Sequence, residues 1–450
     1  MKLKNIIIVL ALATAFTSCE EQLDLAPLSA VGDNGFYTSA DEVEGAVIAI
    51  YDGLQTLPLR EFALTEMRSD NAKSKSREGD WAQFEANTVA PTNQAVGQYW
   101  AANYNVIFRA NVVLENLDSV SVDADRKQFE GEAKFARALA HFNLVRAFGD
   151  VPIIDQVIIQ TDEDYFDRDA AASVLAFIDA DLASAASLLP ESNEFGRATS
   201  GAANGLLGKV RLTAGDHAGA ASVLAPLVNG STYSLMSDYS DVFYQEGNNE
   251  ILFAIPYVND DVNESQDFSY EMTAFGVRAG LNYLTDDFKN SMSPDDTLRA
   301  PVIVSSNNAN ETGKYLTTSA DVRRCGNDWI VLRHADVLLM YAEAVMGTST
   351  QTADANAIAA YNAVRKRAGQ SEVTGGDALT KEALADERRF ELAFENHRLY
   401  DLIRFGNATS VLAAHAAATG NAFEPTDLLL PIPQAEINIS AGKLTQNPGY

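Results

Sequence analysis

The chain has 450 residues, of which 62 are acidic and 33 basic, and its formal net charge at pH 7 is −29. A charge this negative disfavours general affinity for nucleic acid or anionic lipid, so we expect no nucleic-acid partner. The five histidines follow no metal-binding spacing and no phosphate-binding loop is present, so we expect neither a metal nor a cofactor. Two cysteines, Cys19 and Cys325, exclude a disulfide framework, and we predict that Cys325 is a structural thiol.

The N-terminus has the pattern of an export signal. Lys2 and Lys4 precede a short apolar run over residues 6–13, and Cys19 is followed at once by acidic residues. The run is too short to span a bilayer, which takes ~20 apolar residues. Because a cysteine thiol can carry diacylglycerol, residues 1–18 resemble a bacterial lipoprotein signal, with Cys19 lipidated and residues 19–38 as a tether. The alternative is ordinary secretion with an incidental cysteine. We find no later segment with the length and apolarity of a transmembrane helix.

Residues 39–232 are predicted to be helical. Ser39 and Glu42 have the spacing of a capping box, and apolar residues then recur at helical intervals. Further helices are predicted from Tyr99, over 126–148 and over 171–189. Residues 200–228 resemble a tetratricopeptide unit, with two helices and a Gly215-Asp216 turn, and such units bury their faces by stacking.

The second half of the chain divides into a loop-rich and a helical part. Periodicity weakens over 233–329, where residues 250–255 predict a short strand. Helices are predicted again from Ile330, over 354–368 and over 380–404, within a C-terminal region 330–450 that packs on the same domain. The predicted fold is therefore mainly α, a tetratricopeptide-like scaffold of helical pairs with a loop-rich subdomain containing a little β structure.

Several stretches, in order from Cys19 to the last residue, resemble the SusD/RagB family of bacterial outer-membrane nutrient-binding lipoproteins. They include Phe36–Ser39, Ser69–Asn71, Arg109–Asn111, Gly131–Ala138, Phe148–Pro152, Leu332–Ala344, Val364–Gly369, Glu387–Glu395, His397–Arg404, Leu430–Pro433 and Gln446–Tyr450. The resemblance implies a lipoprotein on the outer membrane, facing the cell exterior, and Glu20-Glu21 resembles an acidic surface-export tag. It also implies capture of oligosaccharide or polysaccharide, or of peptides in some members, and delivery to a SusC-like TonB-dependent transporter. No bond is cleaved in that role, so we expect no enzymatic activity.

Sugar capture requires exposed aromatic rings with polar side chains nearby, and loops supply both. Trp81 is the best candidate because it lies in a polar stretch without helical rhythm, with Asp70, Asn71 and Arg77 as companions. Tyr283, Tyr315 and Trp329, in or beside the loop-rich region, are further candidates. Trp100 and Tyr104 lie on a periodic helix and are assigned to the core.

Other functions remain open from the sequence. Arg68, Lys73, Lys75 and Arg77 form either a solvated loop or a site for an acidic sugar. The Glu- and Arg-rich stretch Glu387–Arg404, with Glu343 and Arg333, predicts structural ion pairs between residues at helical spacing. The alternatives to glycan binding are peptide binding, a secreted glycoside hydrolase and a tetratricopeptide adaptor.

Overall fold

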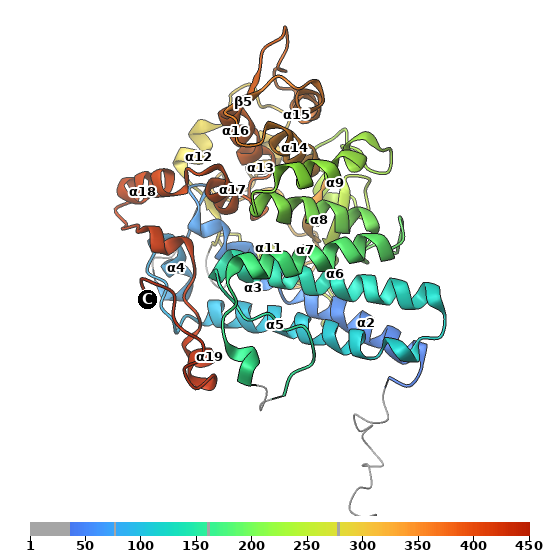
Figure 1. Cartoon of the computed structure of the whole chain (residues 1–450). Helices are drawn as coiled ribbons and strands as arrows, with labels where there is room; N and C mark the ends of the chain where they lie inside the picture. Colours follow the sequence, from blue (N-terminus) through green and yellow to red (C-terminus); the bar gives the residue numbers. More distant parts are fainter. Residues whose placement is uncertain (1–36, 76–77, 160–162, 277–279) are drawn as a thin grey trace, which may run out of the picture.

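The computed structural model describes residues 37–75, 78–159, 163–276 and 280–450, and it confirms the mainly α class (Figure 1). The α-helices are α2 (Ala40–Gln55), α3 (Pro58–Leu64), α4 (Gly79–Ala86), α5 (Gln94–Glu115), α6 (Asp123–Phe148), α7 (Ala171–Leu188), α8 (Ser200–Thr213), α9 (His217–Asn229), α10 (Asp241–Tyr244), α11 (Phe268–Glu271), α12 (Asp286–Ser291), α13 (Ala300–Ile303), α14 (His334–Met346), α15 (Ala355–Arg367), α16 (Lys381–Glu391), α17 (Arg398–Phe405), α18 (Ala408–Thr419) and α19 (Gln434–Ile439). The 3₁₀ helices are η2 (Glu66–Arg68), η3 (Leu117–Ser119), η4 (Glu163–Phe166) and η5 (Pro425–Leu428). The strands are β1 (Ala72–Lys73), β2 (Ile251–Ile255), β3 (Tyr283–Leu284), β4 (Trp329–Arg333), β5 (Gln351–Thr352) and β6 (Leu379–Thr380).

The long helices α2, α5 and α6 pack side by side (Figure 1). The predicted capping box starts α2: the Glu42 amide donates to Ser39 Oγ, and the Ser39 amide donates to the Glu42 carboxylate. The apolar stripe predicted for this helix is its buried face, with Val43, Val47 and Ile50 all inside the core. Local sequence signals therefore place α2 correctly, whereas α5 begins five residues before the Tyr99 start that the sequence predicted.

Paired helices continue the stack from α6 through α7, α8 and α9, and then through α14 and α15. Gly208 of α8 permits a close crossing, because a Cβ there would lie 2.4 Å from a methyl carbon of Leu224. Gly215 turns the chain with a positive φ of 81°, and the Asp216 carboxylate caps α9. The predicted hairpin over 200–228 is therefore confirmed.

Helix α7 is a correction to the sequence analysis. By length and composition it could cross a membrane, with a mean hydropathy of 1.5 over its 18 residues. Its two aspartates nevertheless pair with arginines of the neighbouring helices, Asp179 with Arg211 and Asp181 with Arg137. It packs between α6 and α8 as one member of the helical stack.

The strands, as far as the structure describes the chain, form three two-stranded antiparallel sheets. The predicted strand 250–255 is β2, and it pairs with β4. The sequence analysis was wrong to begin a helix at Ile330, because residues 329–333 are the strand β4 and α14 begins only at His334. A buried apolar run of this length fits either element until its pairing partner is known.

The predicted helix over 380–404 is two helices. Helix α16 ends at Glu391 and α17 begins at Arg398, with Phe394 and Asn396 between them at φ values of 64° and 62°. The predicted ion pairs are present, but most partners lie on other elements. Arg333 of β4, for example, donates to carboxylate oxygens of Glu391 at 2.6 Å and Glu395 at 2.7 Å.

Cys325 and the domain division complete the comparison with the sequence. Cys325 is fully buried, its thiol donates to the Val322 carbonyl, and burial raises the pKa of that thiol. It is therefore the structural thiol that we predicted.

The largest core cluster contains residues from all three predicted segments, such as Val43, Phe268 and Leu444. The segment boundaries at residues 232 and 329 stay predictions.

Candidate functional site

One surface combines exposed aromatic and cationic side chains on segments from two distant parts of the sequence. We call it the loop face and define it by residues 72–75, helix α4, residues 270–276 and Arg323, whose guanidinium lies over the Tyr270 ring. Strand β1 pairs with β3, so that Lys73 lies opposite Tyr283. The next two residues connect β1 to the other segments of the loop face. The Ser74 amide donates to Glu85 of α4, and Lys75 Nζ donates to the Ala274 carbonyl.

Phe275 is the most exposed feature of the loop face, with 80 % of its surface accessible. The backbone on either side of it is fixed. The Ala274 amide donates to the buried Glu311 carboxylate at 2.7 Å, and the Phe275 amide donates to Thr273 Oγ1. Gly276 is required in this turn, since a Cβ there would lie 2.7 Å from Glu271 Cα. A single exposed ring is common on protein surfaces, so Phe275 is distinguished by the anchored backbone that holds its ring in solvent. The sequence analysis missed this residue.

Tyr270 lies at the start of the same segment and is half-buried. The Arg323 guanidinium lies 5.7 Å from the centre of its ring, within cation–π range. Thr273 Oγ1 donates to the Tyr270 carbonyl, which ties the two ends of the segment together. Phe275 and Tyr270 are therefore held in one short turn, with a cation beside the second ring.

Trp81 is half-buried rather than fully exposed, and the stretch around it is the helix α4, which the sequence analysis had read as irregular. Its ring contacts Phe62 at 5.8 Å and Phe84 at 5.7 Å between ring centres. One side of Trp81 therefore packs on the core, and its role in ligand binding stays a prediction.

Asp70 and Asn71 lie behind this surface. Asp70 is 4 % exposed and accepts two hydrogen bonds from Arg398, at 2.7 and 2.9 Å. Burial alone would raise the pKa of Asp70, but Arg398 and Arg389 outweigh it and the pKa is lowered. Asn71 is fully buried and accepts from Arg389 Nε. Their oxygens are already engaged by protein groups, so both residues hold the scaffold.

Tyr283, Tyr315 and Trp329 are 6, 2 and 3 % exposed, so the expectation that loops would expose them is wrong. Tyr315 and Trp329 stack on each other with ring centres 5.5 Å apart. Both also contact Phe268, which contacts Phe62 beneath Trp81. Tyr315, Trp329 and Phe268 therefore form an aromatic core that lies behind the loop face.

The remaining predictions divide between the core and the undescribed residues. Trp100 is buried, as predicted, and Tyr104 is half-buried with its hydroxyl donating to Pro152. Arg68 of the predicted basic cluster is buried and donates to the Asp427 carbonyl, whereas Lys75 is exposed. Cys19 and Arg77 lie outside the described residues.

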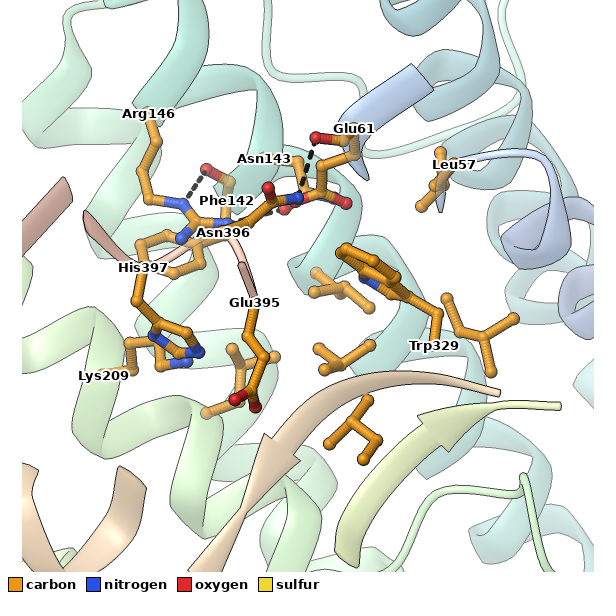
Figure 2. Close-up of a pocket in the computed structure, with 15 residues that line it drawn as sticks. Leu57, Glu61, Phe142, Asn143, Arg146, Lys209, Trp329, Glu395, Asn396 and His397 are labelled. Atoms are coloured by element: carbon orange, nitrogen blue, oxygen red, sulfur yellow. Dashed lines mark hydrogen bonds between the residues drawn. The ribbon is translucent and has the colours of Figure 1, made fainter. Parts of the chain in front are cut away.

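A polar pocket lies in the interior between α3, α6, α8 and the α16–α17 turn (Figure 2). Glu61, Arg146, Lys209 and His397 point toward it, but its volume of about 40 Å³ has room only for water-sized molecules. Burial and the nearby Lys209 charge lower the pKa of His397 to about 3, so the imidazole is neutral. This pocket is too small for a sugar ring.

A larger hollow of about 370 Å³ lies between α2 and residues 194–197. Ile48 and Phe195 line it and are 59 and 42 % exposed. Over the described residues, no group of three or more His, Cys, Asp or Glu side chains is arranged to hold a metal ion. Arg197, which also lines this hollow, pairs with Glu132 and Glu44, whereas Lys75 on the loop face has no carboxylate partner among the described residues.

The stacked helical pairs and the loops that they carry define a helical scaffold protein with an exposed ring and exposed cations at its periphery. Two family models match the chain: one described as the SusD family over residues 299–450, the other as "Starch-binding associating with outer membrane" over residues 29–212. The chain belongs to the SusD family, as the sequence resemblance predicted.

Curated relatives match over most or all of the chain. SusD-like protein P25 of Formosa agariphila is 27 % identical, and the alignment covers 100 % of both chains. A SusD-like protein of Bacteroides ovatus is 27 % identical over 89 % of this chain and 82 % of its own.

Solved structures share the fold. A laminarin-binding SusD-like protein is 26 % identical, with a TM-score of 0.75 over 92 % of this chain and 100 % of its own. Surface glycan-binding protein A of Bacteroides thetaiotaomicron, solved with laminarihexaose, is 22 % identical, with a TM-score of 0.74 over 90 and 99 % of the two chains. A SusD homologue from the same organism is 24 % identical, with a TM-score of 0.79 over 92 and 98 %.

Proposed function

We propose that this protein is a cell-surface lipoprotein that binds oligosaccharide or polysaccharide and delivers it, uncleaved, to a SusC-like TonB-dependent transporter. The observation that carries the proposal is Phe275, a ring 80 % exposed on an anchored turn of a SusD-family fold. Aromatic rings cover the apolar faces of pyranose rings, and neighbouring polar groups fix their hydroxyls. The 26 % identical laminarin-binding relative supports a glycan as the ligand class.

The ligand site in this proposal is the loop face. Phe275 and Tyr270 supply ring surfaces, and the accessible part of Trp81 supplies a third. Lys75 and Arg323 are the charged groups beside them. Asp70 and Asn71 contribute indirectly, since they fix η2 and β1 against the arginines of α16 and α17.

Binding without cleavage is consistent with the acidic groups behind this surface. Glycoside hydrolysis requires two carboxyl groups about 5 to 10 Å apart on either side of the scissile bond. Glu311, the carboxylate next to Phe275, is buried and already accepts from the Ala274 amide and from Asn308. It holds the turn in place and does not face a ligand.

We further propose that Cys19 carries the lipid anchor and that residues 19–38 connect it to α2. The description of one matching family as associating with the outer membrane supports this location. Replacing Cys19 with Ser should abolish incorporation of labelled fatty acid and release the protein from the outer-membrane fraction. Retention of label in that variant would contradict the assignment.

A binding screen of the mature chain against diverse oligo- and polysaccharides, with a peptide panel beside it, tests the ligand class. We expect saturable binding to at least one glycan and no release of reducing ends on long incubation. Affinity for peptides alone would replace the proposal with a peptide-uptake role. Release of reducing ends would indicate a hydrolase. Capture of the transporter from outer membranes by the tagged lipoprotein tests the partner.

A further inference from the structure

Most cations of this acidic protein are paired with carboxylates. Arg299 and Arg333, both 1 % exposed, each contact several carboxylates. On the surface, Arg126 pairs with Asp118 at 2.8 Å. Several exposed cations of the described residues, Lys366 among them, have no carboxylate partner, so a cation is of interest here only where it also lies beside an exposed or half-buried ring.

Lys75 is one such exception on the loop face. It is exposed, and Nζ donates to the Ala274 carbonyl at 3.3 Å. No carboxylate oxygen of the described residues lies within 4 Å of this ammonium group. The Lys75 charge is therefore fixed next to Phe275 and remains available to an incoming group.

Arg323 is the second exception. It is exposed, and its recorded side-chain contact is with the Tyr270 ring, 5.7 Å from the ring centre. The adjacent Arg324, by contrast, pairs with Asp321 at 3.5 Å. Within the described ranges Arg323 has no carboxylate partner, so its guanidinium edge is open for the two parallel hydrogen bonds that a planar anion accepts.

Both cations contact the same six-residue segment, Tyr270–Phe275, one through a ring and the other through the Ala274 carbonyl. The carboxylate within this segment, Glu271, is 2 % exposed, and the neighbouring Glu311 is also buried and turned toward the Ala274 amide and Asn308. The exposed ring of Phe275 and the half-buried ring of Tyr270 thus belong to one segment that is contacted by two cations without a carboxylate partner in the described residues, although the chain as a whole is strongly negative.

We propose, building on the proposed function, that the glycan bound at the loop face is anionic. A sugar ring packs on Phe275 or Tyr270, and a carboxylate or sulfate ester on that sugar contacts Lys75 and Arg323. Uronic acids and sulfated sugars share the chemistry that this arrangement recognises, a fixed negative charge beside a pyranose face.

The test compares three hexasaccharides, a polyuronate, a sulfated galactan fragment and the neutral laminarihexaose, by calorimetry at 50 and 500 mM NaCl. The full mature chain is measured as wild type and as the double variant Lys75→Gln/Arg323→Gln. Each contact between exposed charges contributes about 0.2–1 kcal/mol, so we expect roughly 2- to 30-fold weaker binding of an anionic chain by the double variant. Binding of laminarihexaose should change less than about 2-fold. The affinity difference between wild type and double variant should shrink at high salt, because exposed charges are screened over about 8–10 Å at physiological ionic strength.

Lys366→Gln on α15 is the matched control, because Lys366 is also exposed and has no carboxylate partner in the described part of the chain. This variant should bind every glycan as the wild type does. The proposal is supported if the wild type prefers an anionic hexasaccharide and only the double variant loses this preference. Comparing the affinities for the polyuronate and the sulfated hexasaccharide then identifies which anion is bound. Equal or tighter binding of laminarihexaose by the wild type overturns it while leaving glycan binding intact. Failure of all glycans to bind overturns the proposed function itself.

Discussion

The charge network beneath α16 and the loop face use the same residue types in opposite ways. In the network, Arg333 contacts Glu250, Glu391 and Glu395, and Lys314 Nζ donates to Glu395 at 2.6 Å, with all five side chains nearly inaccessible. On the loop face, Lys75 and Arg323 contact only a carbonyl and a ring among the described residues. A charged side chain saturated by protein partners stabilises the scaffold, whereas one left unpaired beside exposed rings can still bind a ligand.

The largest effect should come from breaking the network at Arg333. Arg333→Met removes the cation from three buried carboxylates, and leaving buried charges unpaired costs about 3–5 kcal/mol. The free energy of unfolding in urea measures this loss. Arg126→Met, which breaks an exposed pair with Asp118, is the control and should change stability by less than about 1 kcal/mol. Equal losses of stability in the two variants would contradict the contrast between the buried network and an exposed ion pair.

Asp70 tests whether a residue at the edge of the loop face belongs to the scaffold. Asp70→Asn removes the charge that pairs with Arg398 and Arg389, and we expect a loss of about 1–3 kcal/mol in stability. Glycan affinity of the folded variant should stay within about 2-fold of wild type. A large loss of affinity without a loss of stability would instead place Asp70 in direct contact with ligand.

Glu66 provides a pH test of the interior. It is 1 % exposed, and burial raises the pKa of its carboxyl to about 7, above an unfolded value near 4.5. Between these two pH values the folded state binds more protons than the unfolded state, so this group contributes stability that is lost as the pH rises from about 5 to 7.

Glu66→Gln should therefore remove that dependence. The free energies of unfolding of both proteins are measured at pH 5 and pH 8. The value for the variant minus that for the wild type should be about 1–3 kcal/mol larger at pH 8 than at pH 5. A constant difference between the two proteins at both pH values would show that Glu66 ionises normally in the fold.

The smallest effect on stability and a specific effect on binding should come from Phe275→Ala. Because the ring is 80 % exposed, the free energy of unfolding should change by less than about 0.5 kcal/mol. Truncating an aromatic anchor costs about 1 kcal/mol or more in binding, so glycan affinity should fall about 5- to 10-fold. Phe195→Ala, at another exposed phenylalanine, should leave affinity unchanged. Unchanged affinity in Phe275→Ala would exclude this ring from the site.

Much of the scaffold follows from the sequence because its signals are local. The capping box at Ser39, the apolar stripe of α2 and the glycine turn at Gly215 each act within a few residues. Such signals locate helices without knowledge of what packs on them. They fail where the pairing partner is remote in sequence. Strand β4 is an example, because it pairs with β2, which begins 78 residues earlier, and Arg333 lies opposite Ile251.

The sequence by itself determined the helical scaffold, the family resemblance and the structural nature of Cys325. Only the tertiary structure decided which aromatic residues are exposed. Trp329 and Tyr315 read as loop residues yet stack in the core, whereas Phe275 shows no motif and is exposed. Exposure is decided by what the rest of the chain places around a side chain. For the same reason, only the fold separated the paired cations from Lys75 and Arg323, because an ion pair depends on residues that are distant in sequence and close in space.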